Sequence, residues 1–190
     1  MFAIPLSDTL AAELRPLEPW QAPEFLAHMD RARANLAPFI PWGDRSTDLD
    51  SARATLQAYA DKQAADTGRL YGIWLDGTLV GGVMFVSFDI RFGNCEIGVW
   101  TEPAGEGRGL VSAAVRHLIE YALVERGLQR VEWLSSTLNA RSRAVAQRAG
   151  MSLDGVLRSY FPNAGIRHDK EVWSILADEW LTSELRPVRG

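Results

Sequence analysis

The segment EGRGLV at 106–111 has the clearest capacity for chemistry in this sequence. It follows a strand-like run at 94–101 and precedes a helix-like run at 110–126. The first amides of a helix have no intrahelical acceptor and carry partial positive charge, so they bind phosphate well. Gly107 and Gly109 bring no Cβ atom into the way of a ligand, and Arg108 adds a positive charge. The segment therefore predicts either a phosphate or pyrophosphate site, or simply a tight turn before a helix.

Two common nucleotide motifs do not fit this segment. A P-loop ends in Gly-Lys followed by Ser or Thr, whereas Gly109 is followed by Leu110 and Val111. A dinucleotide-binding fingerprint needs a third glycine, which falls on Leu110 in one register and on Ser112 in the other. The sequence therefore excludes both motifs.

The cysteine and the histidines indicate no metal site. Cys95 is the only cysteine, so a disulfide and a multi-cysteine metal site are excluded, and a reducing cytoplasm is expected. We interpret Cys95 as a core residue and not as a nucleophile. His28, His117 and His168 lack the spacing of metal ligands. We expect His28 to lie on the surface and His117 to lie on the surface or in packing.

Composition limits the class of protein. The chain has 190 residues, 47% hydrophobic and 23% charged, which predicts one domain over 1–190 with its core at about 10–180. A net charge of −4 argues against direct nucleic-acid binding and against an anionic membrane surface. No apolar run reaches the roughly 18 residues of a membrane helix. Residues 1–14 also lack the pattern of a signal peptide.

Hydrophobic periodicity supplies the elements that would position these residues. Alternation and turn signals, including Asp76-Gly77 as a two-residue hairpin, predict about seven strands in a mixed, mostly antiparallel sheet with helices on both faces. Thr47 or Asp48 is expected to cap the second helix, and the tail after Trp180 is expected to be dispensable. Strands are expected at 11–17, 70–75, 79–88, 94–101, 129–136, 151–161 and 168–176, and helices at 19–35, about 48–66, 110–126 and 139–149.

Four segments in order resemble the GNAT superfamily of acetyl-CoA-dependent N-acetyltransferases, and within it the RimJ/RimL-type ribosomal-protein N-terminal acetyltransferases. They are NLAPFIPWGDRSTDLDSARATL (35–56), CEIGVWTEPAGEGRGLVSAAV (95–115), NARSRAVAQRAGM (139–151) and LDGVLRSYFPNAGIRHDKEVWSIL (153–176). The resemblance covers about 10–180 and implies the GNAT fold, a mixed α/β architecture.

The sequence departs from the family pattern at four positions. In the pyrophosphate turn, Glu106 replaces Gln or Arg and Val111 replaces Gly or Ala, while the central Gly109 is kept. Ala146 stands where many members have the tyrosine that protonates the leaving thiolate, so a tyrosine acid is excluded there. Trp173 stands where the branch often has tyrosine.

The resemblance implies direct attack of an amine on the thioester of acetyl-CoA, without a covalent enzyme intermediate or a metal. It implies Glu96 as the base, acting directly or through water, with Glu132 as an alternative; an ion-paired strand glutamate is the competing interpretation of Glu96. Ser142 is implied as the thiol-side contact or acid, with proton delivery through water as an alternative. Asn139 is implied as a pantetheine contact, although Asn and Ser are also ordinary helix caps. The implied coenzyme-binding residues are Val99, Trp100, Thr101, Glu106, Gly107, Arg108, Gly109, Leu110, Val111 and Asn139.

The acceptor pocket is expected between the loop at 36–48 and the hairpin tip at 162–168. Acidic side chains (Glu96, Asp44 and Asp89) would attract a cationic amine. A protein or peptide N-terminus is the first choice of acceptor, a small amine or antibiotic is the second, and a non-catalytic acyl-CoA-binding regulator is the alternative from another class. A homodimer is compatible with the resemblance. The expected acceptor-site residues are Phe39, Trp42, Tyr160, Phe161 and His168.

Overall fold

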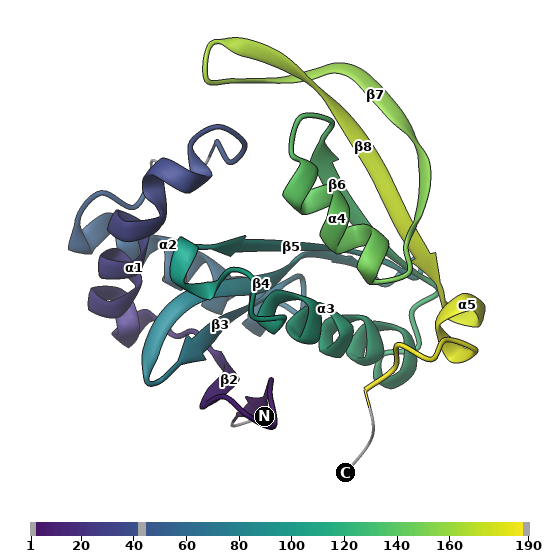
Figure 1. Ribbon diagram of the computed structural model, residues 1–190, viewed down its shortest axis with the longest axis horizontal. Coiled ribbons are helices and arrows are strands. Elements are labelled where there is room, and N and C mark those ends of the chain that lie inside the picture. The colour runs from purple at the N-terminus through teal and green to yellow at the C-terminus, as the bar shows by residue number, and fades with distance from the viewer. Residues whose placement is uncertain (1–2, 42–44, 188–190) are drawn as a thin grey trace. The chain divides into compact units, whose positions relative to one another are not determined.

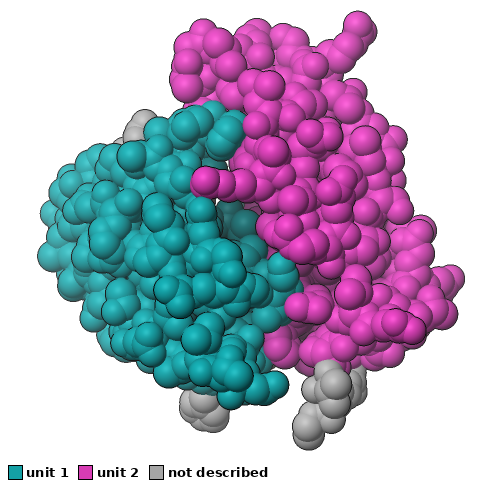
Figure 2. All heavy atoms as spheres, in the orientation of Figure 1, with its two compact units in different colours: residues 1–84, 99–114 teal, residues 85–98, 115–190 magenta. Residues whose placement is uncertain are grey.

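The computed structural model describes residues 3–41 and 45–187. The chain forms two compact units, one of residues 1–84 and 99–114 and the other of residues 85–98 and 115–190 (Figure 2). Within the described ranges, no helix is both long and apolar enough to cross a membrane.

The first unit combines N-terminal strands with two helices (Figure 1). Strand β2 pairs antiparallel with β1 and with β3, and Leu14 of β2 lies opposite Ile73 of β3 in the buried core. Helix α2 packs against α1 and β3. The elements are β1 (Ile4–Pro5), β2 (Ala12–Pro16), η1 (Pro19–Gln21), α1 (Ala22–Leu36), α2 (Leu49–Ala64), β3 (Arg69–Leu75) and the first part of β4 (Thr78–Asp89).

Local sequence signals explain the boundaries of these elements. The Asp48 carboxylate accepts the Ser51 amide at 2.8 Å, which confirms Asp48 as the cap of α2. Asp76 and Gly77 adopt φ values of 49° and 76°, which confirms the two-residue hairpin between β3 and β4. In α1, Phe25, Met29, Ala32 and Leu36 are buried along one face.

The second unit carries the remaining strands. Strand β5 pairs with β6 in parallel, β6 pairs antiparallel with β8, and β8 pairs antiparallel with the long outer strand β7. Helix α4 packs on β6, and α5 packs beside β8 (Figure 1). The elements are β5 (Asn94–Thr101), α3 (Leu110–Glu120), the π-helical η3 (Tyr121–Glu125), β6 (Arg130–Ser136), α4 (Ala140–Arg148), β7 (Ser152–Asn163), β8 (Ile166–Leu176) and α5 (Ala177–Leu181), with β5 and α3 beginning or ending in the first unit.

The strand order is β1-β2-β3-β4-β5-β6-β8-β7, an eight-stranded mixed sheet. This confirms the predicted mixed α/β class, with one strand more than the seven expected. The additional strand, β1, covers only Ile4–Pro5 and pairs with Leu14 and Glu13 of β2. Two residues are too few for alternation to be detected, so the sequence gives no signal for it.

The C-terminal segment contradicts the expectation that it is dispensable. Glu120 of α3 is buried. Its carboxylate accepts the Trp180 indole N–H at 2.7 Å and two N–H groups of the Arg186 guanidinium at 2.8 and 3.0 Å. A buried carboxylate needs such partners, so the tail contributes to the fold.

Candidate active site

The glycine-rich turn, residues 102–109, follows the end of β5 in the first unit. The Glu102 amide donates to the Val80 carbonyl at 3.0 Å, and the short 3₁₀ helix η2 (Pro103–Gly105) follows. The first intrahelical bond of α3 joins the Ala113 amide to the Gly109 carbonyl at 3.0 Å. The amides of Leu110 and Val111 therefore have no acceptor within the helix, which is the arrangement that binds anions.

Backbone conformation explains the two glycines of the turn. Gly107 and Gly109 have φ values of 71° and 76°, in the left-handed region that favours glycine. A Cβ atom built on either residue would meet nothing within 4 Å. The neighbouring Arg108 is exposed and donates to the Ala104 carbonyl at 3.1 Å. The conformation requires glycine, and the space beside it leaves the backbone open to a ligand.

One face of α1 supports this turn through three polar residues at i, i+3 and i+7. His28 Nδ1 and Arg31 Nε both bond to the same Glu102 carboxylate oxygen, at 3.2 and 2.7 Å. Arg31 also donates to the Leu79 carbonyl at 2.9 Å. Asn35 donates to Glu106 Oε1 at 3.0 Å and to the Thr101 carbonyl at 3.2 Å. Sequence analysis missed this set, although the spacing of 28, 31 and 35 on one helix face was visible.

His28 is fully buried, so the expectation that it lies on the surface is wrong. Trp100 can only donate from its indole N–H, and it donates to His28 Nε2 at 2.9 Å. The His28 proton must therefore be on Nδ1, where it is donated to Glu102. Burial is the largest cause that lowers the pKa of His28, from 6.5 to about 4, against the raising effect of Glu102. The ring is neutral, and it links Trp100 at the end of β5 to the first residue of the turn.

At the end of β5, the side chains of Trp100 and Thr101 make contacts within the protein. The Trp100 side chain is 1% exposed and packs edge-on against Phe25. A Cβ atom on Gly82 would lie 2.1 Å from the Trp100 ring, so glycine is required there. Thr101 Oγ1 donates to the Val80 carbonyl at 3.1 Å. Any coenzyme contact at Trp100 would therefore involve its main chain.

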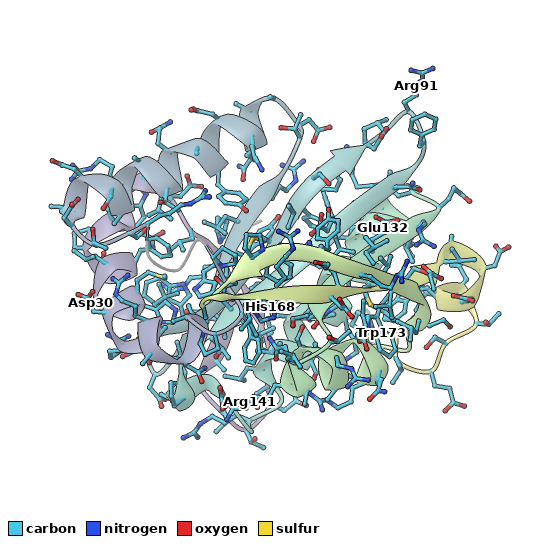
Figure 3. The ribbon with its side chains drawn as sticks, turned by 90° about the horizontal axis from the view of Figure 1, so that it is seen from above. Asp30, Arg91, Glu132, Arg141, His168 and Trp173 are labelled. Carbon is cyan, nitrogen blue, oxygen red and sulfur yellow. The ribbon has the colours of Figure 1, made fainter. Side chains whose placement is uncertain are left out.

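In the second unit, two glutamates lie side by side. Glu96 of β5 is the direct partner of Glu132 of β6 in the parallel register, so their side chains share one face of the sheet. Glu132, labelled in Figure 3, accepts from Arg130 Nε at 2.7 Å. Arg130 also bonds to Asp154 at 2.5 Å. Glu132 is thus held in an ion pair with Arg130, and Glu96 beside it is half-buried.

The opposite face of this sheet is apolar. Cys95 and Ile97 alternate with Glu96 and are buried at 2% and 1% exposure. Burial raises the pKa of the Cys95 thiol to about 12, so the thiol stays protonated near neutral pH. This confirms Cys95 as a core residue.

Helix α4 presents Asn139 and Ser142 on that apolar face. Asn139 caps the helix, its side-chain oxygen accepting the Ser142 amide at 3.1 Å. Ser142 Oγ accepts the Trp133 indole N–H at 3.0 Å, and Trp133 shares the face of Cys95 and Ile97. The Ser142 oxygen therefore accepts one hydrogen bond, and the hydroxyl can still donate its proton to another partner. The Glu96 side chain and Ser142 thus lie on opposite faces of the sheet.

His168 is the buried support of the β7–β8 hairpin (Figure 3). Its Nε2 lies 3.3 Å from the Asn163 carbonyl, which can only accept, so Nε2 carries the proton. Nδ1 lies 2.8 Å from the Ser136 hydroxyl and makes a hydrogen bond with it. The ring stacks on Phe161 with a centroid separation of 4.9 Å. Both nitrogens are used within the unit, so His168 shapes the hairpin from inside.

The other predicted acceptor-site residues are distributed over both units. Tyr160 is half exposed on β7, with the Lys170 ammonium 4.5 Å from its ring centroid. Phe39 is half-buried directly after α1. Trp42 and Asp44 lie outside the described residues. In residues 3–41 and 45–187, no cluster of His, Cys, Asp and Glu could hold a metal ion.

Comparison with known proteins finds one family. The model of the acetyltransferase (GNAT) domain matches residues 12–152. The putative ribosomal N-acetyltransferase YdaF of Bacillus subtilis (strain 168) is 31% identical over 172 residues, 88% of this chain and 92% of that protein. A solved probable acetyltransferase has a TM-score of 0.87 at 29% identity, covering 95% of this chain and 99% of its own. RimL, a ribosomal α-N-protein acetyltransferase solved with coenzyme A, has a TM-score of 0.87 at 21% identity, covering 93% and 99%.

Proposed function

Because this chain belongs to the GNAT acetyltransferase family, we propose that it transfers the acetyl group of acetyl-CoA to the N-terminal amine of a ribosomal protein. The name of the Bacillus relative supports a ribosomal acceptor. The observation that carries the proposal is the turn at Gly107 and Gly109, whose open backbone leads into the N-terminus of α3. We propose a single catalytic domain over 1–190 that acts in the cytoplasm.

Acetyl-CoA supplies an activated acyl carbon and an anionic diphosphate. The diphosphate is proposed to bind the amides from Glu106 to Val111, with Arg108 adding charge. The pantetheine arm is proposed to follow Val99, Trp100 and Thr101 and to contact Asn139. The fit is chemically sound, because the turn offers backbone donors and positive-φ glycines with no side chain over them.

Proton transfer is assigned to Glu96 and Ser142. Glu96 would take a proton from the attacking amine, directly or through water. Ser142 would donate its hydroxyl proton toward the leaving sulfur, and the bond that it accepts from Trp133 polarises that hydroxyl. The Val99 or Trp100 amide would stabilise charge on the carbonyl oxygen.

The acceptor is proposed to contact Phe39, Trp42, Tyr160 and Phe161, with His168 behind the last two. An exposed aromatic ring and a half-buried one suit a peptide chain, which presents both apolar and polar groups. A small amine or antibiotic is the competing acceptor, and it would need the same base.

The test is acetyl transfer across classes of amine. The purified chain is incubated with acetyl-CoA and with peptides that begin with Ser or Ala, with polyamines, or with amine antibiotics. Free thiol and product mass are then measured. The proposal predicts acetylated peptide α-amines. Transfer only to small amines would replace the acceptor assignment, and coenzyme binding without transfer to any amine would indicate a non-catalytic protein.

A further inference from the structure

The turn proposed to hold a diphosphate has a carboxylate of its own. Glu106 lies immediately before Gly107, within four residues of the first residue of α3. A carboxylate near a helix N-terminus is attracted to the same unused amides that bind a phosphate. If its side chain were unrestrained, Glu106 would act as an internal competitor of the diphosphate and would repel it. The Glu106 side chain must therefore be held in place if the turn is to bind a diphosphate.

Asn35 holds the Glu106 side chain through a hydrogen bond. Its side-chain NH₂ group donates one bond to Glu106 Oε1 at 3.0 Å and one to the Thr101 carbonyl at 3.2 Å. With both bonds made, the position of the amide is fixed by the main chain of β5, and the carboxylate is bound to α1. An aspartate at this position could not donate either bond, and an alanine would leave the carboxylate without this partner.

The remainder of the support does not depend on Asn35. Arg31 and His28 hold Glu102 from the preceding two turns of α1, and the Glu102 amide is bonded to Val80 at 3.0 Å. Removal of the Asn35 side chain should therefore break the bond between the Glu106 carboxylate and α1 while the beginning of the turn stays anchored. This separates an electrostatic effect on the ligand from general loss of structure.

We propose that Asn35 is a positioning residue for coenzyme binding, which keeps the Glu106 carboxylate from competing with the diphosphate. The inference rests on the proposed function, since it assumes that the turn binds acetyl-CoA. It also explains how an acidic residue can occupy a position where the family pattern has Gln or Arg.

The experiment is a double-mutant cycle read out by calorimetric titration with coenzyme A. Asn35→Ala should raise Kd by about tenfold at low salt, because the Glu106 carboxylate would lose its bond to α1 and could approach the polyanion. The increase should shrink at high salt, because a partly exposed charge is screened. Adding Glu106→Gln to Asn35→Ala should restore most of the affinity. With acetyl-pantetheine as donor, which lacks the diphosphate, Asn35→Ala should raise KM far less than it raises the Kd of coenzyme A.

A matched control uses an amide that binds a carboxylate elsewhere. Gln57→Ala removes the 2.9 Å bond from Gln57 to Asp61 on α2 and should not change Kd. Asn35→Ser is a second variant, should Asn35→Ala not fold. If the wild type does not bind coenzyme A, the proposed function fails. If it binds, but Asn35→Ala binds equally well or the double variant stays as weak as Asn35→Ala, only the inference on Asn35 is overturned.

Discussion

Two buried histidines support the two parts of the candidate site, and they donate from opposite ring nitrogens. His28, under the glycine-rich turn, accepts from Trp100 at Nε2 and donates from Nδ1 to Glu102. His168, in the β7–β8 hairpin, donates from Nε2 to the Asn163 carbonyl and makes a hydrogen bond with the Ser136 hydroxyl at Nδ1. In each ring, the role of Nε2 is set by a partner that can only donate or only accept.

The regions around the two histidines contain different kinds of residues. His28 belongs to a charged cluster in which His28 and Arg31 hold the carboxylate of Glu102, and Arg31 also bonds to the Leu79 carbonyl. The second unit instead places the proposed proton-transfer groups, the half-buried Glu96 and Ser142, on a sheet that also carries the ion pairs of Arg130 with Glu132 and Asp154. We infer that the turn region is built for binding and rigidity and the sheet region for chemistry. Substitutions should therefore affect affinity or stability in the first region and rate in the second.

The largest effect is expected at Glu96. Glu96→Gln should lower kcat by about 10²–10³-fold, since it removes the proposed base while the shape is kept. The Kd of coenzyme A should stay within about twofold, because the turn is untouched. Steady-state kinetics with a peptide acceptor, together with calorimetry, measures both values.

Glu132→Gln is the matched control for this prediction. Glu132 is in register with Glu96 on the adjacent strand and is already paired with Arg130. The Glu132→Gln variant should reduce kcat far less than Glu96→Gln does. Equal losses in the two variants would remove Glu96 as the specific base, and a large loss of coenzyme affinity in Glu96→Gln would break the division between the regions.

The charged cluster of the turn should be visible in the pH dependence of stability. Since burial lowers the pKa of His28 from 6.5 to about 4, the unfolded chain binds more protons than the folded one between these values. The free energy of unfolding should therefore be fully developed above pH 6.5 and fall by about 3 kcal/mol as the pH drops to 4.

His28→Gln tests this dependence, because an amide can accept from Trp100 and donate to Glu102 but does not titrate. Urea unfolding is measured at several pH values between 4 and 7 for both proteins. The variant should lose less stability than the wild type on acidification. Parallel curves for the two proteins would show that His28 does not release a proton on folding.

Periodicity predicted most of the fold and few of the polar contacts. Alternation and 3.6-residue spacing located the long elements, and Asp48 and the Asp76-Gly77 pair marked a cap and a hairpin. Such patterns report which face of an element is buried. They do not report which polar partner, far along the chain, meets a buried charge, and for this reason His28 was misplaced.

The unpredicted contacts all join distant segments. His28 and Glu102 are 74 residues apart, Asn35 and Glu106 are 71 apart, and Glu120 and Arg186 are 66 apart. No local signal in the sequence pairs these residues, since each side chain alone fits an ordinary solvated helix face, turn or tail. The assignments of Glu96 and Ser142 came from family resemblance and stay predictions until the variants are measured.

A smaller change in rate is expected at Ser142. Ser142→Ala removes the proposed donor to the leaving sulfur and should lower kcat by about tenfold, since water can take over part of the proton delivery. Ser142→Thr keeps the hydroxyl and should recover most of the rate. Coenzyme affinity should change little in either variant. If Ser142→Ala keeps full activity, the hydroxyl serves only as the partner of Trp133.

The smallest expected effect distinguishes two glycines with nearly the same backbone. Gly107 and Gly77 have φ values of 71° and 76°, and a Cβ atom on either would meet nothing within 4 Å. Alanine at each should cost a similar free energy of unfolding, about 1 kcal/mol, because both sites are left-handed. Only Gly107→Ala should also weaken coenzyme A, by about fivefold, since its Cβ atom would stand beside the amides proposed to bind the diphosphate. Equal coenzyme affinities in the two variants, measured at matched stability, would mean that the diphosphate does not approach the backbone at Gly107.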